Sequence, residues 1–277
     1  MERIALDRAG YRYPDGTEAV ADVSLSVSGG EFIGLLGANG SGKSTLLFMM
    51  DGLLKDYSGS VRLDGKEIRS LGPKDIYRRM GLIFQNPDSQ LFASTVAEDV
   101  AFGPLNMGMS RSEVDSRVDE ALRAVDMSEH ARKGINNLSF GQKKRVCIAG
   151  LLAMGHEILL MDEPTAGLDP MGEYRMMGLL RKLNESGVTI VMATHSVDLV
   201  PLFLDRLFIL SKGRIKRGGS PEDVFTVPEE MESVKLRLPH IAELIHKLRH
   251  EDGLDFRRTP LTVGEARRML LERLGGG

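Results

Sequence analysis

A glycine-rich stretch near the start of the chain has the residues of a phosphate-binding loop. Residues 37–44 read GANGSGKS, which matches G-x-x-x-x-G-K-[ST], and they lie between an expected strand at 31–36 and an expected helix at 43–54. Glycines let consecutive N–H groups face a phosphate, and the helix start adds a positive dipole. We expect a nucleotide to be held by Gly37, Ala38, Asn39, Gly40, Ser41, Gly42, Lys43, Ser44 and Thr45.

Within this loop two side chains carry chemistry of their own. Lys43 supplies a full positive charge for the β- and γ-phosphates, and the hydroxyl of Ser44 suits Mg²⁺. A plain glycine-rich turn would not need a strand on one side and a helix on the other. The flanking pattern therefore favours the phosphate-binding interpretation.

Two carboxylates follow a second apolar strand. Residues 158–163 read ILLMDE, so Asp162 and Glu163 come at the carboxyl end of the strand, where ligands bind in open α/β sheets. One acid suffices to hold Mg²⁺, which leaves Glu163 free to orient or deprotonate an attacking water. Without the phosphate loop, a solvated acidic strand end would be the better interpretation.

The surrounding pattern predicts how these groups are positioned. Strand-like runs at 158–161, 188–193 and 206–210 alternate with helical segments, which is typical of a parallel sheet covered on both faces. An antiparallel region precedes them, and residues 94–153 are helical, with capping-box patterns at Thr95 and Ser110. We expect one domain over residues 1–225 and a small helical extension over 226–277.

Composition excludes several classes of protein. The chain has 277 residues, 42% of them hydrophobic and 27% charged, with a net charge of −3. These values exclude a disordered chain and give no reason to expect nucleic acid as a partner. The single cysteine, Cys147, lies in an apolar run and is expected to be buried and inert. No membrane span or secretory signal is expected, so we predict a soluble intracellular protein.

Three further motifs together resemble the ATPase subunit of an ABC transporter. They are LSFGQ at 138–142, DEPTAGLD at 162–169 and Thr194-His195, and the resemblance covers about residues 4–225. It implies a RecA-like P-loop NTPase core with a mostly parallel sheet, an antiparallel β subdomain and an inserted helical signature subdomain. It also implies that Tyr13 stacks on adenine, with Tyr11 as a rival, that Gln85 reaches Mg²⁺ and the lytic water, and that His195 contacts the γ-phosphate.

The LSFGQ motif has no group that could do the chemistry itself. The Ser139 hydroxyl, the Gly141 N–H and the following helix suit a phosphate. The resemblance implies that these groups, with Gln142 and Asp169, face ATP held by a second ATPase subunit, identical or related. Phe140 departs from the pattern, because glycine is more frequent there. The chain is thus expected to hydrolyse Mg-ATP only as a dimer.

The stretch at 85–104 indicates which class of ABC transporter ATPase the chain resembles. It resembles energy-coupling-factor importers, especially the cobalt-type ATP-binding subunit, which implies docking to integral membrane partners through Asp88, Gln90, Leu91 and Phe92 at the cytoplasmic face of the membrane. The competing interpretation has Phe92 packed in its own core. Cobalt is the first expected cargo and nickel the next. A shared ATPase for vitamin receptors and a soluble, non-transport ABC ATPase remain alternatives.

The tail offers two more hypotheses. Residues 238–244 and 259–266 resemble the C-terminal extension of this group, which implies a role in joining the two ATPase subunits. On a helix from Ile241, the side chains of Glu243, His246 and His250 share one face, and histidines at i and i+4 can chelate a metal. A solvated polar face explains the same pattern.

Overall fold

The computed structural model describes residues 1–254, 256 and 258–274. The strands are β1 (Glu2–Arg12), β2 (Glu18–Ser28), β3 (Phe32–Leu36), β4 (Ser58–Leu63), β5 (Lys66–Glu67), β6 (Met80–Ile83), β7 (Ile158–Asp162), β8 (Thr189–Thr194), β9 (Arg206–Ser211) and β10 (Arg214–Gly219). The helices are α1 (Lys43–Met50), α2 (Pro73–Tyr77), α3 (Val96–Asn106), α4 (Arg111–Ala124), α5 (Phe140–Ala153), α6 (Pro170–Glu185), α7 (Val200–Phe203), α8 (Pro221–Val224), α9 (Pro228–Ser233), α10 (His240–His250) and α11 (Val263–Leu274). Short 3-10 helices lie at Ile68–Ser70, Pro87–Ser89, Ser128–His130 and Ile135–Asn137.

A mostly parallel sheet forms the centre of the molecule. Its strand order is β10-β9-β3-β8-β7-β6, and only β10 runs antiparallel to its neighbour. All residues of β3, β7 and β8 are buried, as expected for strands covered on both faces. Leu36 pairs with Thr194, and Asp162 pairs with Ala193, so the loops that follow these strands meet at one edge.

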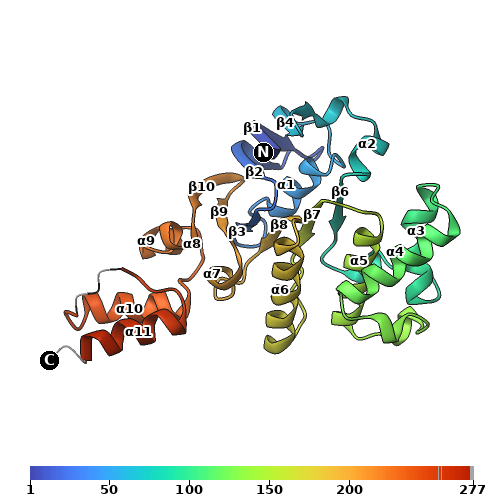
Figure 1. Ribbon diagram of the computed structural model, residues 1–277. Coiled ribbons are helices and arrows are strands. Elements are labelled where there is room, and N and C mark those ends of the chain that lie inside the picture. The colour runs from blue at the N-terminus through green and yellow to red at the C-terminus, as the bar shows by residue number, and fades with distance from the viewer. Residues whose placement is uncertain (255, 257, 275–277) are drawn as a thin grey trace.

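Two hydrophobic cores flank this sheet. Ile33 and Leu35 of β3 join the core that also contains α1 and the antiparallel sheet β2-β1-β4-β5. Phe32 and Leu36, which point the other way, join the core on the helical side. Figure 1 shows the antiparallel sheet above the central strands and α6 below them. The predicted combination of a parallel sheet, an antiparallel region and a helical insert is confirmed.

The helical insert projects at one end of the molecule (Figure 1). Its helices begin where the sequence predicts: Thr95 and Ser110 each form a capping box with the glutamate three residues later. A capping box satisfies two N–H groups that a helix start would otherwise leave unpaired. Val114, Val118 and Leu122 of α4 are buried against α5, the helix that follows the LSFGQ motif.

Helix α1 is shorter than predicted. It ends at Met50 rather than near residue 54, because Gly52 takes a left-handed conformation with φ of 75°. The N–H groups of Leu53 and Leu54 both donate to Phe48 O and close the turn. The periodic apolar residues alone could not show this stop.

The C-terminal helices lie at the opposite end of the molecule from the insert (Figure 1). Met231 and Val234 are buried in the same core as the helical side of the central sheet, and α10 contacts α11. The domain boundary near residue 225 stays a prediction. Cys147 is 3% exposed, and burial raises the pKa of its thiol to about 12, as expected for an inert residue. Within the described ranges, no helix combines the length and apolar character that crossing a membrane requires.

Candidate active site

The phosphate loop leaves β3 and enters α1 through two positions where only glycine fits. Gly42 has φ of 105°, and a Cβ there would lie 2.3 Å from Ala19 O of β2. A Cβ on Gly37 would lie 2.5 Å from Leu210 O of β9. The loop is therefore held close to two other segments, and its curvature depends on these glycines.

Lys43 is held inside the loop that it follows. Its ammonium donates to Gly37 O at 2.8 Å and to Ala38 O at 3.3 Å. It also lies 3.7 Å from Glu163 Oε1. Burial lowers the pKa of Lys43, and the charges of Glu163 and Asp162 oppose that shift. The cation is thus directed toward the place where the sequence predicts phosphate.

The two carboxylates at the end of β7 are both buried and play different parts. Burial raises the pKa of Asp162, and a hydrogen bond from Ser44 opposes the shift. Glu163 takes a left-handed conformation with φ of 49°, and its N–H donates to Ala193 O at 3.0 Å. This turn directs its carboxylate toward the loop after β8, where its Oε2 lies 3.0 Å from His195 Nδ1.

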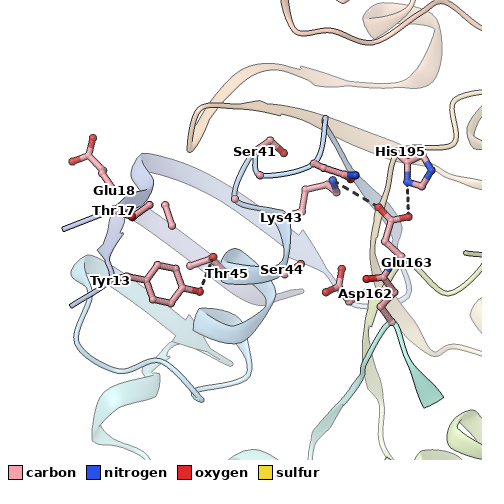
Figure 2. Close-up of a pocket in the computed structure, with 15 residues that line it drawn as sticks. Tyr13, Thr17, Glu18, Ser41, Lys43, Ser44, Thr45, Asp162, Glu163 and His195 are labelled. Carbon is pink, nitrogen blue, oxygen red and sulfur yellow. Dashed lines mark hydrogen bonds and ion pairs between the residues drawn. The ribbon is translucent and has the colours of Figure 1, made fainter. Parts of the chain in front are cut away.

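These groups line one cavity of about 410 Å³. Figure 2 shows Lys43, Glu163 and His195 facing one another, with Asp162 and Ser44 beside them. Its lining residues are Tyr13, Thr17, Glu18, Ala19, Asn39, Gly40, Ser41, Gly42, Lys43, Ser44, Thr45, Gln85, Asp162, Glu163 and His195. The structure therefore brings Tyr13, Gln85 and His195, predicted from separate motifs, to the phosphate loop.

Three lining residues were not predicted from the sequence. Thr17 lies just before β2, and Glu18 and Ala19 begin it. All three reach the cavity because the hairpin between β1 and β2 returns them beside the loop. No motif marks them. Their only signal in the sequence is their nearness to Tyr13 across a short turn.

Tyr13 is better placed than Tyr11 to meet a base. The Tyr13 hydroxyl lies 3.1 Å from Thr45 Oγ1, at the edge of the cavity (Figure 2). Tyr11 packs edge-on against Tyr13, with centroids 5.0 Å apart, and lines a different cavity with Asp56 and Arg214. This arrangement favours Tyr13, whose role in stacking on adenine stays a prediction.

Three oxygen donors that line the cavity fit Mg²⁺. Ser44 offers a hydroxyl oxygen, Asp162 a carboxylate and Gln85 an amide oxygen, and all three line the same cavity. These are hard oxygen ligands, which Mg²⁺ prefers, and few enough to leave room for water and phosphate oxygens.

The LSFGQ motif lies apart from this cavity. Ser139, Gly141 and Gln142 line a separate cavity of about 260 Å³ between the helical insert and the start of α6. Ser139 is the N-cap of α5 and forms a capping box with Gln142, which also lies 2.9 Å from His130. Asp169 caps α6 by accepting from Gly172 N at 2.6 Å. One chain thus keeps its phosphate loop and its LSFGQ helix start at different places.

The predicted docking stretch is only partly exposed. Phe92 is 64% exposed and packs edge-on against Phe102, which is 49% exposed, with centroids 4.6 Å apart. Leu91 is half-buried, and Asp88 pairs with Lys143 at 2.6 Å. Gln90 turns inward instead: its amide accepts from Phe84 N and donates to Leu82 O. Gln90 is half-buried like Leu91, and its amide is engaged by the backbone of Leu82 and Phe84 in the isolated chain, so its role in docking stays a prediction.

The histidine pair of the tail lacks the ligands of a metal site. The rings of His246 and His250 lie 4.3 Å apart, and Glu243 pairs with Lys247. Across residues 1–254, 256 and 258–274, no group of three or more His, Cys, Asp or Glu side chains could hold a metal ion.

Comparisons with known proteins decide the family. The family model described as ABC transporter matches residues 20–166, which include the phosphate loop, the LSFGQ motif and Asp162-Glu163. The chain belongs to the ABC transporter family. It follows that the chain is an ABC ATPase, with the cassette fold that the sequence resemblance implied.

Full-length relatives agree with this family. An ABC transporter ATP-binding protein of Geobacter sulfurreducens is 70% identical over 98% of this chain and 97% of its own length. The energy-coupling factor transporter ATP-binding protein of Methanococcus maripaludis is 46% identical over 96% of each chain. The solved structure of cbiO1 from Clostridium perfringens, part of the ABC transporter complex cbiONQ, is 41% identical. It covers 89% of this chain and 100% of its own, with a TM-score of 0.78.

Proposed function

We propose that this ABC ATPase energises an importer of the energy-coupling-factor type. Two ATPase chains close on two Mg-ATP, hydrolyse them, and pass the motion to integral membrane partners at the cytoplasmic face of the membrane. The resemblance of residues 85–104 and the name of the Methanococcus maripaludis relative support the importer class. The observation that carries the chemistry is the Glu163 carboxylate, placed between Lys43 and His195 in the cavity.

In this proposal Glu163 is the general base. It takes a proton from water as the water oxygen bonds to the γ-phosphorus, and the bond from that phosphorus to the β-γ bridging oxygen breaks to give ADP and phosphate. His195, hydrogen-bonded to Glu163, orients the carboxylate and contacts the γ-phosphate. Lys43 and the loop N–H groups stabilise the charge that develops on the phosphate oxygens.

Ser44, Gln85 and Asp162 would hold Mg²⁺ in this site. When bound, Mg²⁺ neutralises charge on the phosphate oxygens. Its expected ligands come from the first turn of α1, the loop after β6 and the last residue of β7. Tyr13 packs on the adenine, where stacking is worth about 1–3 kcal/mol and distinguishes bases weakly.

The second chain completes each site. Ser139, Gly141 and Gln142 do not line the cavity at the phosphate loop. They lie at the N-terminus of α5, which suits an anion. We propose that they, with Asp169, meet the ATP bound to the partner. In this proposal the C-terminal extension, residues 226–277, helps to join the two chains.

The cargo we propose is divalent cobalt, with nickel next. This choice rests on the likeness of residues 85–104 to cobalt-type subunits. Uptake by vesicles that contain the full complex tests the choice: cobalt should be accumulated on addition of ATP, and exclusive uptake of nickel or of a vitamin would reassign the cargo.

Two measurements test the function itself. Glu163→Gln should bind ATP yet lose turnover by at least about a hundredfold, because the base is gone; full turnover would disprove its role. The wild-type chain should co-purify with integral membrane proteins from its own cell. Recovery with soluble partners alone would instead favour a non-transport ABC ATPase.

A further inference from the structure

Lys144 is a buried lysine that the proposed reaction does not use. It lies in the first turns of α5 and is 1% exposed, although a lysine is seldom buried without a partner. Its ammonium donates to Glu163 O at 2.9 Å and to Ala166 O at 2.8 Å. Both acceptors are backbone carbonyls of the turn that carries the general base.

The turn that Lys144 contacts is tightly closed. Glu163 takes φ of 49°, and its carbonyl accepts from Ala166 N at 3.1 Å as well as from Lys144. A non-glycine residue in this conformation is held there by its surroundings. Two donors on one carbonyl supply such a restraint, and they fix the direction in which the Glu163 side chain leaves the backbone.

Phe140 covers the same contact from the helix start. Its ring centroid lies 5.1 Å from Lys144 Nζ, within the range of a cation–π interaction. The ring also packs on Gly167, where a Cβ would lie 3.0 Å from Phe140 Cε1. Gly167 has φ of 79°, so this position requires glycine. Phe140, at a position where glycine is more frequent in the family, thus has a structural role in this chain.

The charges around Lys144 also favour its contact with the turn at Glu163. Burial lowers the pKa of Lys144 to about 8, while the charges of Glu163, Asp162 and Glu173 act against that shift. Two of the three N–H donors of the Lys144 ammonium form charge-assisted hydrogen bonds to carbonyls, and the face of the Phe140 ring lies against the cation.

We infer that Lys144, with Phe140 across it, is a positioning residue that sets the orientation of Glu163 from the LSFGQ helix. This inference rests on the proposed role of Glu163 as the base. Its consequence follows from connectivity. The Lys144 side chain joins the first turn of α5 to the turn that holds Glu163 in the same chain. Because the first turn of α5 is proposed to meet the partner's ATP, a shift of α5 reaches Glu163 directly.

The test compares substitutions at Lys144 by turnover and by ATP affinity. Lys144→Met keeps the length of the side chain but has no donor, and it should lower kcat by at least about tenfold. The ATP dissociation constant should change by less than about threefold, because the phosphate loop is untouched. Lys144→Gln retains N–H donors and should recover part of kcat. Lys182→Met, at an exposed position of α6, is the matched control.

A double-substitution cycle separates positioning from general loss of structure. In the Glu163→Gln background, Lys144→Met should change the residual turnover by less than about twofold, because there is no base left to orient. An equal loss in both backgrounds, or full turnover in Lys144→Met, would overturn the inference. If Lys144→Met does not fold, Lys144→Gln and Phe140→Leu are carried through the same cycle. Full turnover of Glu163→Gln alone would count against the proposed base and not against the contact made by Lys144.

Discussion

Lys43 and Glu163 lie 3.7 Å apart, ammonium to carboxylate, although Lys43 begins α1 after the phosphate loop and Glu163 begins the loop after β7. The other carboxylate oxygen of Glu163 is 3.0 Å from His195 Nδ1. One buried carboxylate therefore lies between the cation that we expect on phosphate and the histidine that we expect beside it. The parallel pairing of β3, β8 and β7 brings the three together.

Removing His195 should affect turnover more than binding. His195→Ala leaves the phosphate loop intact but takes one hydrogen-bond partner from Glu163, so kcat should fall by about 10- to 100-fold with less than about a threefold change in ATP affinity. Steady-state kinetics and titration calorimetry measure the two effects. His250→Ala, at an exposed position of α10, is the control. An equal loss of affinity and kcat would argue against this role.

Tyr13 and Tyr11 make different predictions for base stacking. Tyr13→Ala should weaken both ATP and GTP by about 5- to 100-fold, which corresponds to about 1–3 kcal/mol of stacking. Tyr11→Ala should change either affinity by less than about twofold, since Tyr11 lines a separate cavity. Fluorescent-nucleotide titration distinguishes them. The reverse ranking would assign the stacking role to Tyr11.

The exposed aromatic pair should matter only in the assembled transporter. Phe92→Ser combined with Phe102→Ser should leave the ATPase activity of the isolated subunit within about twofold, because neither ring lines the ATP cavity. Uptake by vesicles with the full complex should fall by at least about tenfold, as expected for anchors buried at an interface. Leu53→Ser, also at an exposed apolar position, is the control. Normal uptake by the double variant would exclude docking through this pair.

Glu67 should give the fold a measurable dependence on acid pH. Partial burial alone would raise its pKa, but hydrogen bonds from Ser60, Tyr57 and Arg69 lower the pKa of Glu67 to about 2. A carboxylate whose pKa is lower in the folded chain than in the unfolded chain, where it is about 4.3, stabilises the fold fully at pH values above 4.3. This contribution is lost as the pH falls toward the folded pKa of about 2.

The matching substitution is Glu67→Gln. It should reduce the free energy of unfolding by about 1–2 kcal/mol at pH 7, allowing for screening by solvent, and by less than half of that at pH 3. Urea unfolding at both pH values measures the difference, with the exposed Glu129→Gln as control. The same loss at both pH values would show that the carboxylate charge is not responsible.

The sequence was sufficient to predict the groups at the strand ends. Lys43, Asp162 and His195 each follow a short apolar run bounded by its own motif, and parallel strands bring their carboxyl ends to one edge. Capping boxes predicted helix starts for a similar reason, since the partners are three residues apart. Local spacing gives these positions, whereas the role of His195 followed from the family resemblance.

Contacts between distant segments were not predictable in the same way. Gln90 was expected to face a partner, yet its amide pairs with the backbone of β6 and of Phe84. Lys144 reads as one of two adjacent lysines on a helix, and only the packing of α5 against the turn after β7 shows that it is buried. Such contacts depend on the exact approach of elements, which periodicity does not give.

The most direct test of the account measures turnover per chain together with oligomeric state. ATPase activity is followed over a wide range of protein concentrations, with and without the membrane partners, while sedimentation velocity reports the fraction of dimer. We predict that turnover per chain rises in proportion to the dimer fraction, and that Glu163→Gln with ATP sediments as a stable dimer. Full turnover by chains that remain monomeric would contradict the account.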